Sequence, residues 1–193
     1  MITQLKGRMV EKSPTEVVID CNGVGYMVHI SLNTFSKLTD SESIILFTHL
    51  QVKEDSNTLF GFYEKTERNL FRQLISVSGI GASIARTMLS SLSPSEIQSA
   101  IISGNVSVIQ SIKGIGLKTA QRVIIDLKDK VSAISENDNF IGNISNTNQD
   151  EALSALEVLG YSRKHTNKVI ETLLNNSPEM SVEELIKSAL NKL

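Results

Sequence analysis

One short pattern occurs twice in the chain and constrains the fold more than any other feature. Residues 74–85 and 109–120 each carry Gly-Ile-Gly between apolar residues at helical spacing, and the copies lie 35 residues apart. Two glycines around one apolar residue let the backbone turn sharply between antiparallel helices, while the isoleucine points inward and anchors the turn. A repeat at fixed spacing predicts two copies of one helix–turn–helix unit packed against each other.

The second glycine of each copy precedes a predicted helix, which creates a site for a phosphate group. The first N–H groups of a helix have no partner within it, and the helix N-terminus carries a partial positive charge. Without a side chain in the way, these groups are open to a phosphate oxygen. A single Gly-x-Gly would indicate only a tight turn, but two copies at fixed spacing favour contacts with the sugar–phosphate backbone, which carry no base sequence.

Side chains near the two turns add to this predicted DNA-binding surface unequally. In the second copy Lys118, Thr119 and Arg122 supply a point charge, a hydroxyl donor and a guanidinium fork. In the first copy Ser83 is the nearest donor, and Arg86 follows one turn later. The predicted DNA-binding residues are Gly79, Gly81, Ser83, Arg86, Gly114, Gly116, Lys118, Thr119 and Arg122.

The net charge of −2 conceals a basic segment that contains both turns. Residues 64–131 hold nine Lys or Arg against five Asp or Glu, whereas residues 1–63 hold five against seven and residues 132–150 hold none against three. A basic segment between acidic neighbours indicates a localised contact with a polyanion. We expect binding that is structure-selective or non-specific, and strongly salt-dependent.

The segments on either side of the repeat differ in periodicity. Four runs before residue 63 are rich in β-branched and aromatic residues, at 16–20, 25–30, 44–53 and 58–62. Short strands at this density predict a small barrel, with an open meander as the alternative.

Beyond residue 63 the apolar residues recur at helical spacing. A capping box begins at Ser93, and a longer helix is predicted over 117–131. Asn, Ser, Gly and acidic residues dominate the stretch around residue 140, which predicts a flexible linker. The predicted divisions are a strand-rich domain at 1–63, a helical domain at 64–133, the linker at 134–149 and a three-helix domain at 150–193.

Composition argues against several function classes. The single cysteine, Cys21, precludes an intramolecular disulfide, and with only three scattered histidines it argues against a metal centre. The chain has no Gly-x4-Gly-Lys-Ser/Thr phosphate loop, and no apolar run nears the roughly 18 residues of a membrane span. The N-terminus lacks an apolar signal core. We therefore expect a cytoplasmic protein that binds no metal, cofactor or membrane.

The two Gly-Ile-Gly turns resemble tandem helix-hairpin-helix motifs, which occur in many DNA repair and recombination proteins. Further stretches narrow the resemblance, and they lie at 23–26, 47–49, 53–55, 59–62 and 151–161. Gly-Val-Gly-Tyr, Phe-Thr-His, Lys-Glu-Asp and Leu-Phe-Gly-Phe in the first four are similar to the first domain of the RuvA family, bacterial subunits of the Holliday junction branch-migration complex. The last stretch, Glu-Ala-Leu-Ser-Ala-Leu-Glu-Val-Leu-Gly-Tyr, resembles the third domain of that family.

The resemblance implies a multidomain α+β fold. It comprises an N-terminal OB-type barrel, a central all-α tandem helix-hairpin-helix domain and a small C-terminal three-helix, UBA-like domain. The implied function is that of a non-enzymatic scaffold for four-way junction DNA in recombination, in repair and in the SOS response to DNA damage. The implied partners are further copies of the chain in a homotetramer, with an octamer as an open alternative, a RuvB-type hexameric ATPase and a RuvC-type resolvase.

Glu54 and Asp55 match the acidic pin of the family, although charged residues in a turn are ordinarily only solvated. Carboxylates at a hairpin tip repel phosphates, so four copies around a symmetry axis would exclude continuous duplex from the centre of a junction. Members of the family commonly carry Lys where Ala82 and Ser83 stand. The first hairpin is therefore expected to hold its phosphate mainly through backbone amides.

The resemblance also places contact with the motor ATPase in the third domain. The stretch that carries the match is apolar and ends in a glycine turn, so core and contact residues overlap in it. The predicted partner-binding residues are Leu156, Leu159, Gly160 and Tyr161.

The alternative function is that of a helix-hairpin-helix DNA glycosylase or nuclease. Such a glycosylase needs an aspartate, often with a lysine, near a base pocket, and Asp126, Lys128 and Asp129 follow the second turn. Their spacing beside Lys130 favours solvated charges on one helix instead. Single-strand binding by barrel aromatic residues is a third hypothesis.

Overall fold

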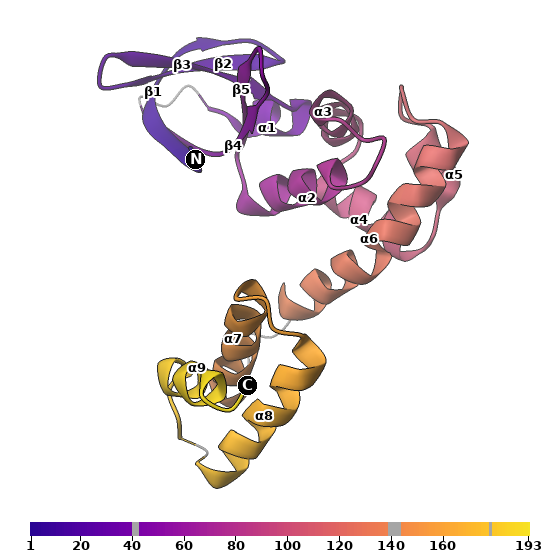
Figure 1. Ribbon diagram of the computed structural model, residues 1–193. Helices are drawn as coiled ribbons and strands as arrows, with labels where there is room; N and C mark the ends of the chain where they lie inside the picture. The colour runs from indigo at the N-terminus through magenta and orange to yellow at the C-terminus, as the bar shows by residue number, and fades with distance from the viewer. Residues whose placement is uncertain (40–42, 139–143, 178) are drawn as a thin grey trace. The chain divides into compact units, whose positions relative to one another are not determined.

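The computed structural model describes residues 1–39, 43–138, 144–177 and 179–193. The chain forms two compact units, Met1–Ser135 and Glu136–Leu193 (Figure 1). The first unit holds two buried hydrophobic clusters, and the second unit holds one. Within the described residues, no helix is both long and apolar enough to cross a membrane.

The first unit begins with a closed barrel of five strands in the order β1-β2-β3-β5-β4. The strands are β1 (Gln4–Lys12), β2 (Glu16–Cys21), β3 (Val24–Ile30), β4 (Ile44–Val52) and β5 (Asn57–Phe62). β3 pairs with β5 in parallel, and the other neighbours are antiparallel. Alternate side chains point inward, so that Val17, Val28 and Leu46 are fully buried. The predicted barrel is confirmed, and the open meander is wrong.

A short helix, α1 (Leu32–Lys37), follows β3. The hydroxyl of Ser31 caps it by accepting a hydrogen bond from the backbone N–H of Thr34. The sequence did not predict this helix, because six residues are too short to show a helical period.

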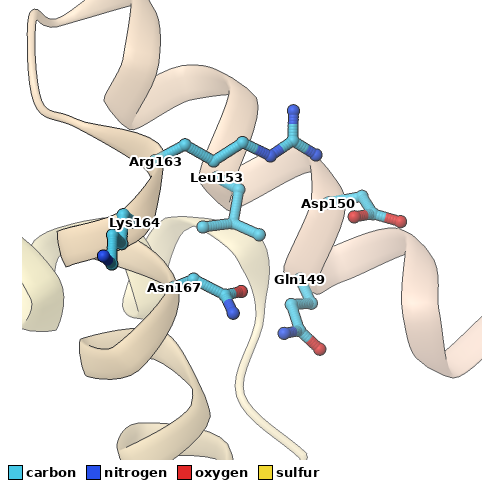
Figure 2. A pocket seen from close by; sticks show the side chains of 6 residues that line it. All are labelled: Gln149, Asp150, Leu153, Arg163, Lys164 and Asn167. Carbon is cyan, nitrogen blue, oxygen red and sulfur yellow. The ribbon is translucent and has the colours of Figure 1, made fainter. Parts of the chain in front are cut away.

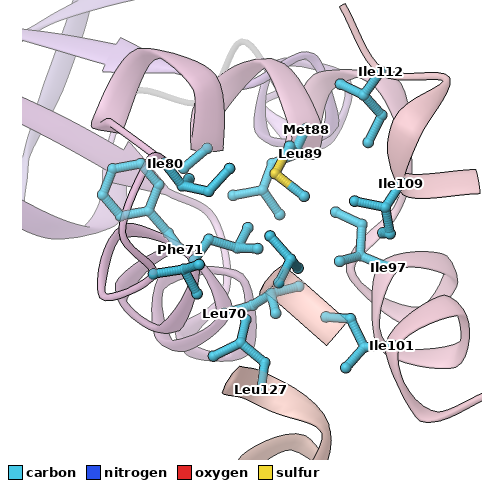
Figure 3. Close-up of a cluster of buried hydrophobic side chains, with 14 of the residues drawn as sticks. Leu70, Phe71, Ile80, Met88, Leu89, Ile97, Ile101, Ile109, Ile112 and Leu127 are labelled. Carbon is cyan, nitrogen blue, oxygen red and sulfur yellow. The ribbon is translucent and has the colours of Figure 1, made fainter. Parts of the chain in front are cut away.

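Five further helices begin in the first unit: α2 (Lys65–Ile75), α3 (Ala82–Ser91), α4 (Pro94–Ile102), α5 (Val106–Gln110) and α6 (Leu117–Asp138). Leu70, Met88, Ile97 and Leu127 meet in their shared core (Figure 3). Both members of the predicted capping box at Ser93 are present at the start of α4.

The core of the helices continues into the barrel. Phe60 and Phe62 of β5 belong to the same buried cluster as the helical residues. Their ring centroids lie 5.2 Å and 4.9 Å from that of Phe71 on α2. The barrel and the helices are therefore packed directly against each other.

The second unit contains α7 (Ile144–Val158), α8 (Arg163–Asn176) and α9 (Val182–Leu190). Its core is small and contains Leu153, Leu156, Ile170 and Leu185. A capping box at Ser181 opens α9.

Helix covers more of the predicted linker than its composition indicated. The predicted helix over 117–131 extends to Asp138, and α7 begins at Ile144, inside the predicted linker at 134–149. No proline or glycine interrupts residues 117–138, so the backbone ladder can continue after the apolar period fades. Residues 139–143 lie outside the described residues.

Candidate nucleic-acid interface

The two Gly-Ile-Gly turns have matching backbone geometry. Gly79 and Gly114 adopt left-handed φ angles of 96° and 92°, which residues with a Cβ rarely adopt. In the first turn the N–H of Ile80 donates to the carbonyl of Val77 at 3.0 Å. In the second turn the corresponding bond, from Ile115 to Ile112, measures 3.1 Å. The repeat in the sequence is therefore a repeat of structure.

Within each turn the isoleucine and the following glycine face opposite environments. Ile80 and Ile115 are buried, with only 4% and 6% of their surfaces exposed. Gly81 and Gly116 are exposed, and a Cβ at either position would meet nothing within 4 Å. Gly81 is the N-cap of α3 and supplies no side-chain hydrogen bond to its first turn. The space beside both helix starts is therefore open, as an anion-binding site at a helix N-terminus requires.

The two turns lie next to each other. A Cβ built on Gly79 would lie 3.7 Å from Cγ2 and 3.8 Å from Oγ1 of Thr119, in the first turn of α6. Thr119 is half-buried, so it packs one hairpin against the other as well as standing near the predicted phosphate site.

Basic side chains gather mainly at the second hairpin. Lys118 and Arg122 are exposed on α6, as predicted. Lys113 is also exposed, directly before Gly114, and the sequence analysis missed it. Its position beside the glycine turn was the available signal.

At the first hairpin, Arg86 has a structural partner. Arg86 is half-buried as a residue, and its guanidinium donates to the backbone carbonyl of Thr15, between β1 and β2, at 3.3 Å. Ser83 is exposed. The first hairpin therefore offers mainly its backbone amides and one hydroxyl.

The predicted acidic pin lies at the tip of the β4–β5 hairpin. Glu54 and Asp55 are exposed there, and the turn closes through a 2.8 Å bond from the N–H of Lys53 to the carbonyl of Ser56. The Ser56 hydroxyl contacts Asp55 Oδ1 at 3.2 Å. Glu54 precedes Asp55 directly and is also exposed, so the tip carries two carboxylates.

In the second unit, the predicted partner-binding residues divide between core and surface. Leu156 is fully buried, whereas Leu159 and Tyr161 are 57% and 38% exposed. Gly160 has a φ of 97°, and the N–H groups of Gly160 and Tyr161 bond back to α7 as in a Schellman motif. Val158, 88% exposed, extends the apolar surface and was not predicted.

A pocket of about 500 Å³ lies between α7 and α8 in the second unit (Figure 2). Gln149, Asp150, Leu153, Arg163, Lys164 and Asn167 line it. Outside the pocket, Glu157 engages Arg163 at 3.4 Å and Glu171 accepts a bond from the Asn167 amide. Charged and amide side chains therefore make up most of its lining.

The single cysteine and two of the three histidines contact neighbouring groups of the first unit. Cys21 donates its thiol to the carbonyl of Lys6, and His29 lies 3.3 Å from a carboxylate oxygen of Glu16. Burial, together with Arg72 and Arg68, lowers the pKa of His49, which packs against the ring of Phe71. Among the described residues no cluster of three or more His, Cys, Asp or Glu could hold a metal ion. The side chain of Asp129 lies outside the described residues.

Comparison with known proteins places these features in a family. Three family models match the chain: the RuvA N-terminal domain at residues 1–61, the SAM-like helix-hairpin-helix tandem at 71–129 and the RuvA C-terminal domain at 147–193. The chain belongs to the RuvA family. RuvA proteins of Christiangramia forsetii and Flavobacterium psychrophilum are each 60% identical over 193 residues, covering all of both chains. The RuvA of Bacteroides fragilis is 43% identical over 201 residues, again covering both chains fully. Each of these relatives is named a Holliday junction branch migration complex subunit.

Proposed function

We propose that the chain is a non-catalytic, cytoplasmic DNA-binding subunit that recognises four-way junctions and recruits a RuvB-type ATPase for branch migration. The observation that carries this proposal is the pair of matched glycine turns in the same unit as an acidic hairpin tip. The names of the relatives, at up to 60% identity over the full chain, support the same function.

The hairpins act on the DNA backbone. The first N–H groups of α3 and α6 donate hydrogen bonds to phosphate oxygens, and Lys118 and Arg122 add charge at the second hairpin. Such contacts position DNA without reading its bases. Ser83, Arg86 and Thr119 complete the proposed contact surface, with Arg86 and Thr119 also supporting its shape.

The acidic tip supplies the selectivity. Glu54 and Asp55 repel phosphates, so they disfavour any DNA that crosses the tip as a continuous duplex. In a four-fold homotetramer, each arm of a junction meets one equivalent pair of hairpins, and four acidic tips surround the crossover. Pairing of two tetramers would enclose the junction from both faces.

The second unit recruits the motor. Leu159 and Tyr161 are exposed apolar or aromatic side chains beside the turn at Gly160, and such a surface suits a protein partner. Leu156 supports this surface from below and does not contact the partner, because its side chain is fully buried in the core. A RuvC-type resolvase would act on the open junction after migration.

A competitive gel-shift titration tests the proposal. A labelled four-way junction is challenged with unlabelled duplex or single strand of equal length, at two salt concentrations with Mg²⁺ present. We expect strong retention on the junction, weakened by salt, without strand cleavage. Equal competition by duplex would contradict junction recognition, and cleavage would favour an enzyme.

The acidic tip is tested in the same assay with Glu54→Gln and Asp55→Asn combined. We expect tighter binding of plain duplex and a smaller preference for the junction, because the repulsive charge is gone. Lys53→Gln serves as a control, since it changes a charge in the same turn with the opposite sign. An unchanged preference in the double variant would contradict the role of the tip.

A further inference from the structure

A carboxyl group is buried where the barrel meets the helices, outside the DNA-binding surface. Glu67, on α2, is fully buried. One carboxylate oxygen accepts the hydroxyl of Ser31 at 2.5 Å, and the other accepts the hydroxyl of Thr34 at 2.8 Å. Both hydroxyls belong to α1 and its cap, on the barrel side of the contact.

The same hydroxyls are bound to the backbone on both sides of the contact. Ser31 Oγ accepts the N–H of Thr34, which starts α1. Thr34 Oγ1 accepts the N–H of Tyr63, which lies between β5 and α2, at 3.0 Å. The carboxylate of Glu67 therefore links the last barrel strand, α1 and α2 in one connected set of hydrogen bonds.

Neighbouring polar contacts tie the barrel to α3, which carries the first hairpin. The N–H of Leu32 donates to Ser90 Oγ at 3.1 Å, and Arg86 donates to the carbonyl of Thr15. At the base of α2, Arg68 donates to the carbonyl of Thr3 at 2.9 Å. Glu67 lies wholly out of water, as do Ser31 and Thr34, which bond to it.

A buried carboxylate is a poor way to gain stability. Burial raises the pKa of Glu67, because desolvation of the charge outweighs the hydrogen bonds from Ser31 and Thr34 and the nearby charge of Lys37. A well-packed apolar side chain would commonly be as stable in such a place. The carboxylate instead restricts geometry, because its hydrogen bonds form in only one relative placement of α1 and α2. Any other placement would leave buried donors without partners.

We propose that Glu67 is a positioning residue that fixes the barrel against α2 and α3, and thereby sets where the acidic tip stands relative to the hairpins. The tip belongs to β4 and β5, whereas the hairpins belong to the helices, so their spacing depends on how the barrel packs against the helices. The part of the inference that concerns junction selectivity rests on the proposed function. The part that concerns placement does not.

Placement is measured without DNA by the distance between two spin labels. Cys21→Ser removes the single native cysteine, and Ser56→Cys and Ser107→Cys provide exposed labelling sites on the acidic turn and on α5. Labelled chains are diluted in excess unlabelled chain, so that distances within one chain dominate. We expect one narrow distance distribution in the parent, a broadened one in Glu67→Ala, and a narrow one in Glu67→Gln, which keeps the shape and one acceptor. A distribution in Glu67→Ala as narrow as that of the parent overturns the proposal.

Glu64→Gln is the matched control. It removes the same charge at the start of α2, where Glu64 forms an exposed ion pair with Lys37 at 2.9 Å. Exposed pairs hold geometry weakly, so we expect the distribution to stay narrow. If Glu67→Ala does not fold, Thr34→Val replaces it, because it removes one donor to the carboxylate and the acceptor for Tyr63.

Selectivity is measured on the unlabelled variants as the ratio of junction to duplex affinity. We expect this ratio to fall by about ten-fold in Glu67→Ala and to be restored in Glu67→Gln to within about two-fold of the parent. A broadened distance with an unchanged ratio overturns the link between placement and selectivity. Absence of any junction preference in the parent chain contradicts the proposed function instead, and the distance measurement then still decides the placement.

Discussion

At the second hairpin, Gly114 and Gly116 stand two residues apart but face different constraints. Gly114 has a left-handed backbone, so any side chain there is strained, whereas Gly116 lies outside that region and borders open space. Gly116→Val should therefore cost only about 1 kcal/mol of unfolding free energy, through its poor N-cap preference. It should weaken junction binding by about ten-fold or more, because the side chain covers the amides of α6. Denaturant unfolding and gel-shift titration measure the two effects.

Gly104→Ala provides the control for this prediction. Gly104 also has a left-handed backbone, with φ of 70°, but it ends α4 and belongs to neither glycine turn. Its substitution should lower the unfolding free energy by about 1 kcal/mol and leave DNA affinity unchanged. Equal loss of affinity in both variants would show that binding follows stability and not access to the amides.

The raised pKa of Glu67 predicts a pH dependence of stability. Its native pKa lies above the ordinary value, so its contribution is fully present below that ordinary value and is lost as the pH rises through the native pKa. Glu67→Gln cannot titrate. The unfolding free energy of the parent, relative to this variant, should therefore fall as the pH rises above about 4.5, the ordinary pKa of a glutamate. Urea unfolding of both chains at several pH values tests this, and a difference that does not vary with pH would contradict it.

At the level of single elements, the hairpins could be predicted and their connection to the barrel could not. Gly-Ile-Gly determines the local backbone by its own residues, and both turns formed as the repeat predicted. The partners of Glu67 lie 36 and 33 residues earlier in the chain, so no local pattern marks it. The sequence predicts Arg86 as a DNA contact, yet its guanidinium donates a hydrogen bond to a carbonyl 71 residues earlier in the chain.

The two hairpins should differ in how they respond to salt. Lys118 is an exposed charge at the start of α6, whereas Ser83 offers a neutral hydroxyl at the equivalent helix start. Lys118→Ala should reduce the slope of log affinity against log salt by about one unit for each phosphate contact removed. Ser83→Ala should lower affinity with the slope unchanged. Binding titrations over a range of salt concentrations measure both.

Lys130→Ala is the control for the salt prediction. Lys130 is exposed on the same helix, twelve residues from Lys118, which is about 18 Å along the axis. Its removal changes net charge equally but takes no charge from the hairpin. A slope that fell equally in both variants would mean that general charge, and not the hairpin, governs binding.

At the scale of the whole molecule, the division into two units separates the proposed DNA-binding surface from the proposed partner-binding surface. The apolar clusters of Met1–Ser135 contain no residue of the second unit, and the cluster of the second unit contains none of the first. The apolar stretch at residues 151–161 indicated both core and contact residues, but it could not tell the buried Leu156 from the exposed Leu159. That distinction depends on how α8 and α9 pack against α7.

A chain that ends at Asp138, where α6 ends, should bind a four-way junction to within about two-fold of the full chain. The reason is that both hairpins, the acidic tip and the Glu67 contact lie within the first unit. The same chain should no longer stimulate a RuvB-type ATPase on junction DNA. Gel shifts and ATP hydrolysis assays with the added motor measure the two properties.

Full-length Leu159→Ser combined with Tyr161→Ser should reproduce the loss of stimulation while the second unit stays folded, because both side chains are exposed. Loss of junction binding on truncation would contradict this division of roles, and normal stimulation by the double variant would move the motor contact elsewhere on the second unit.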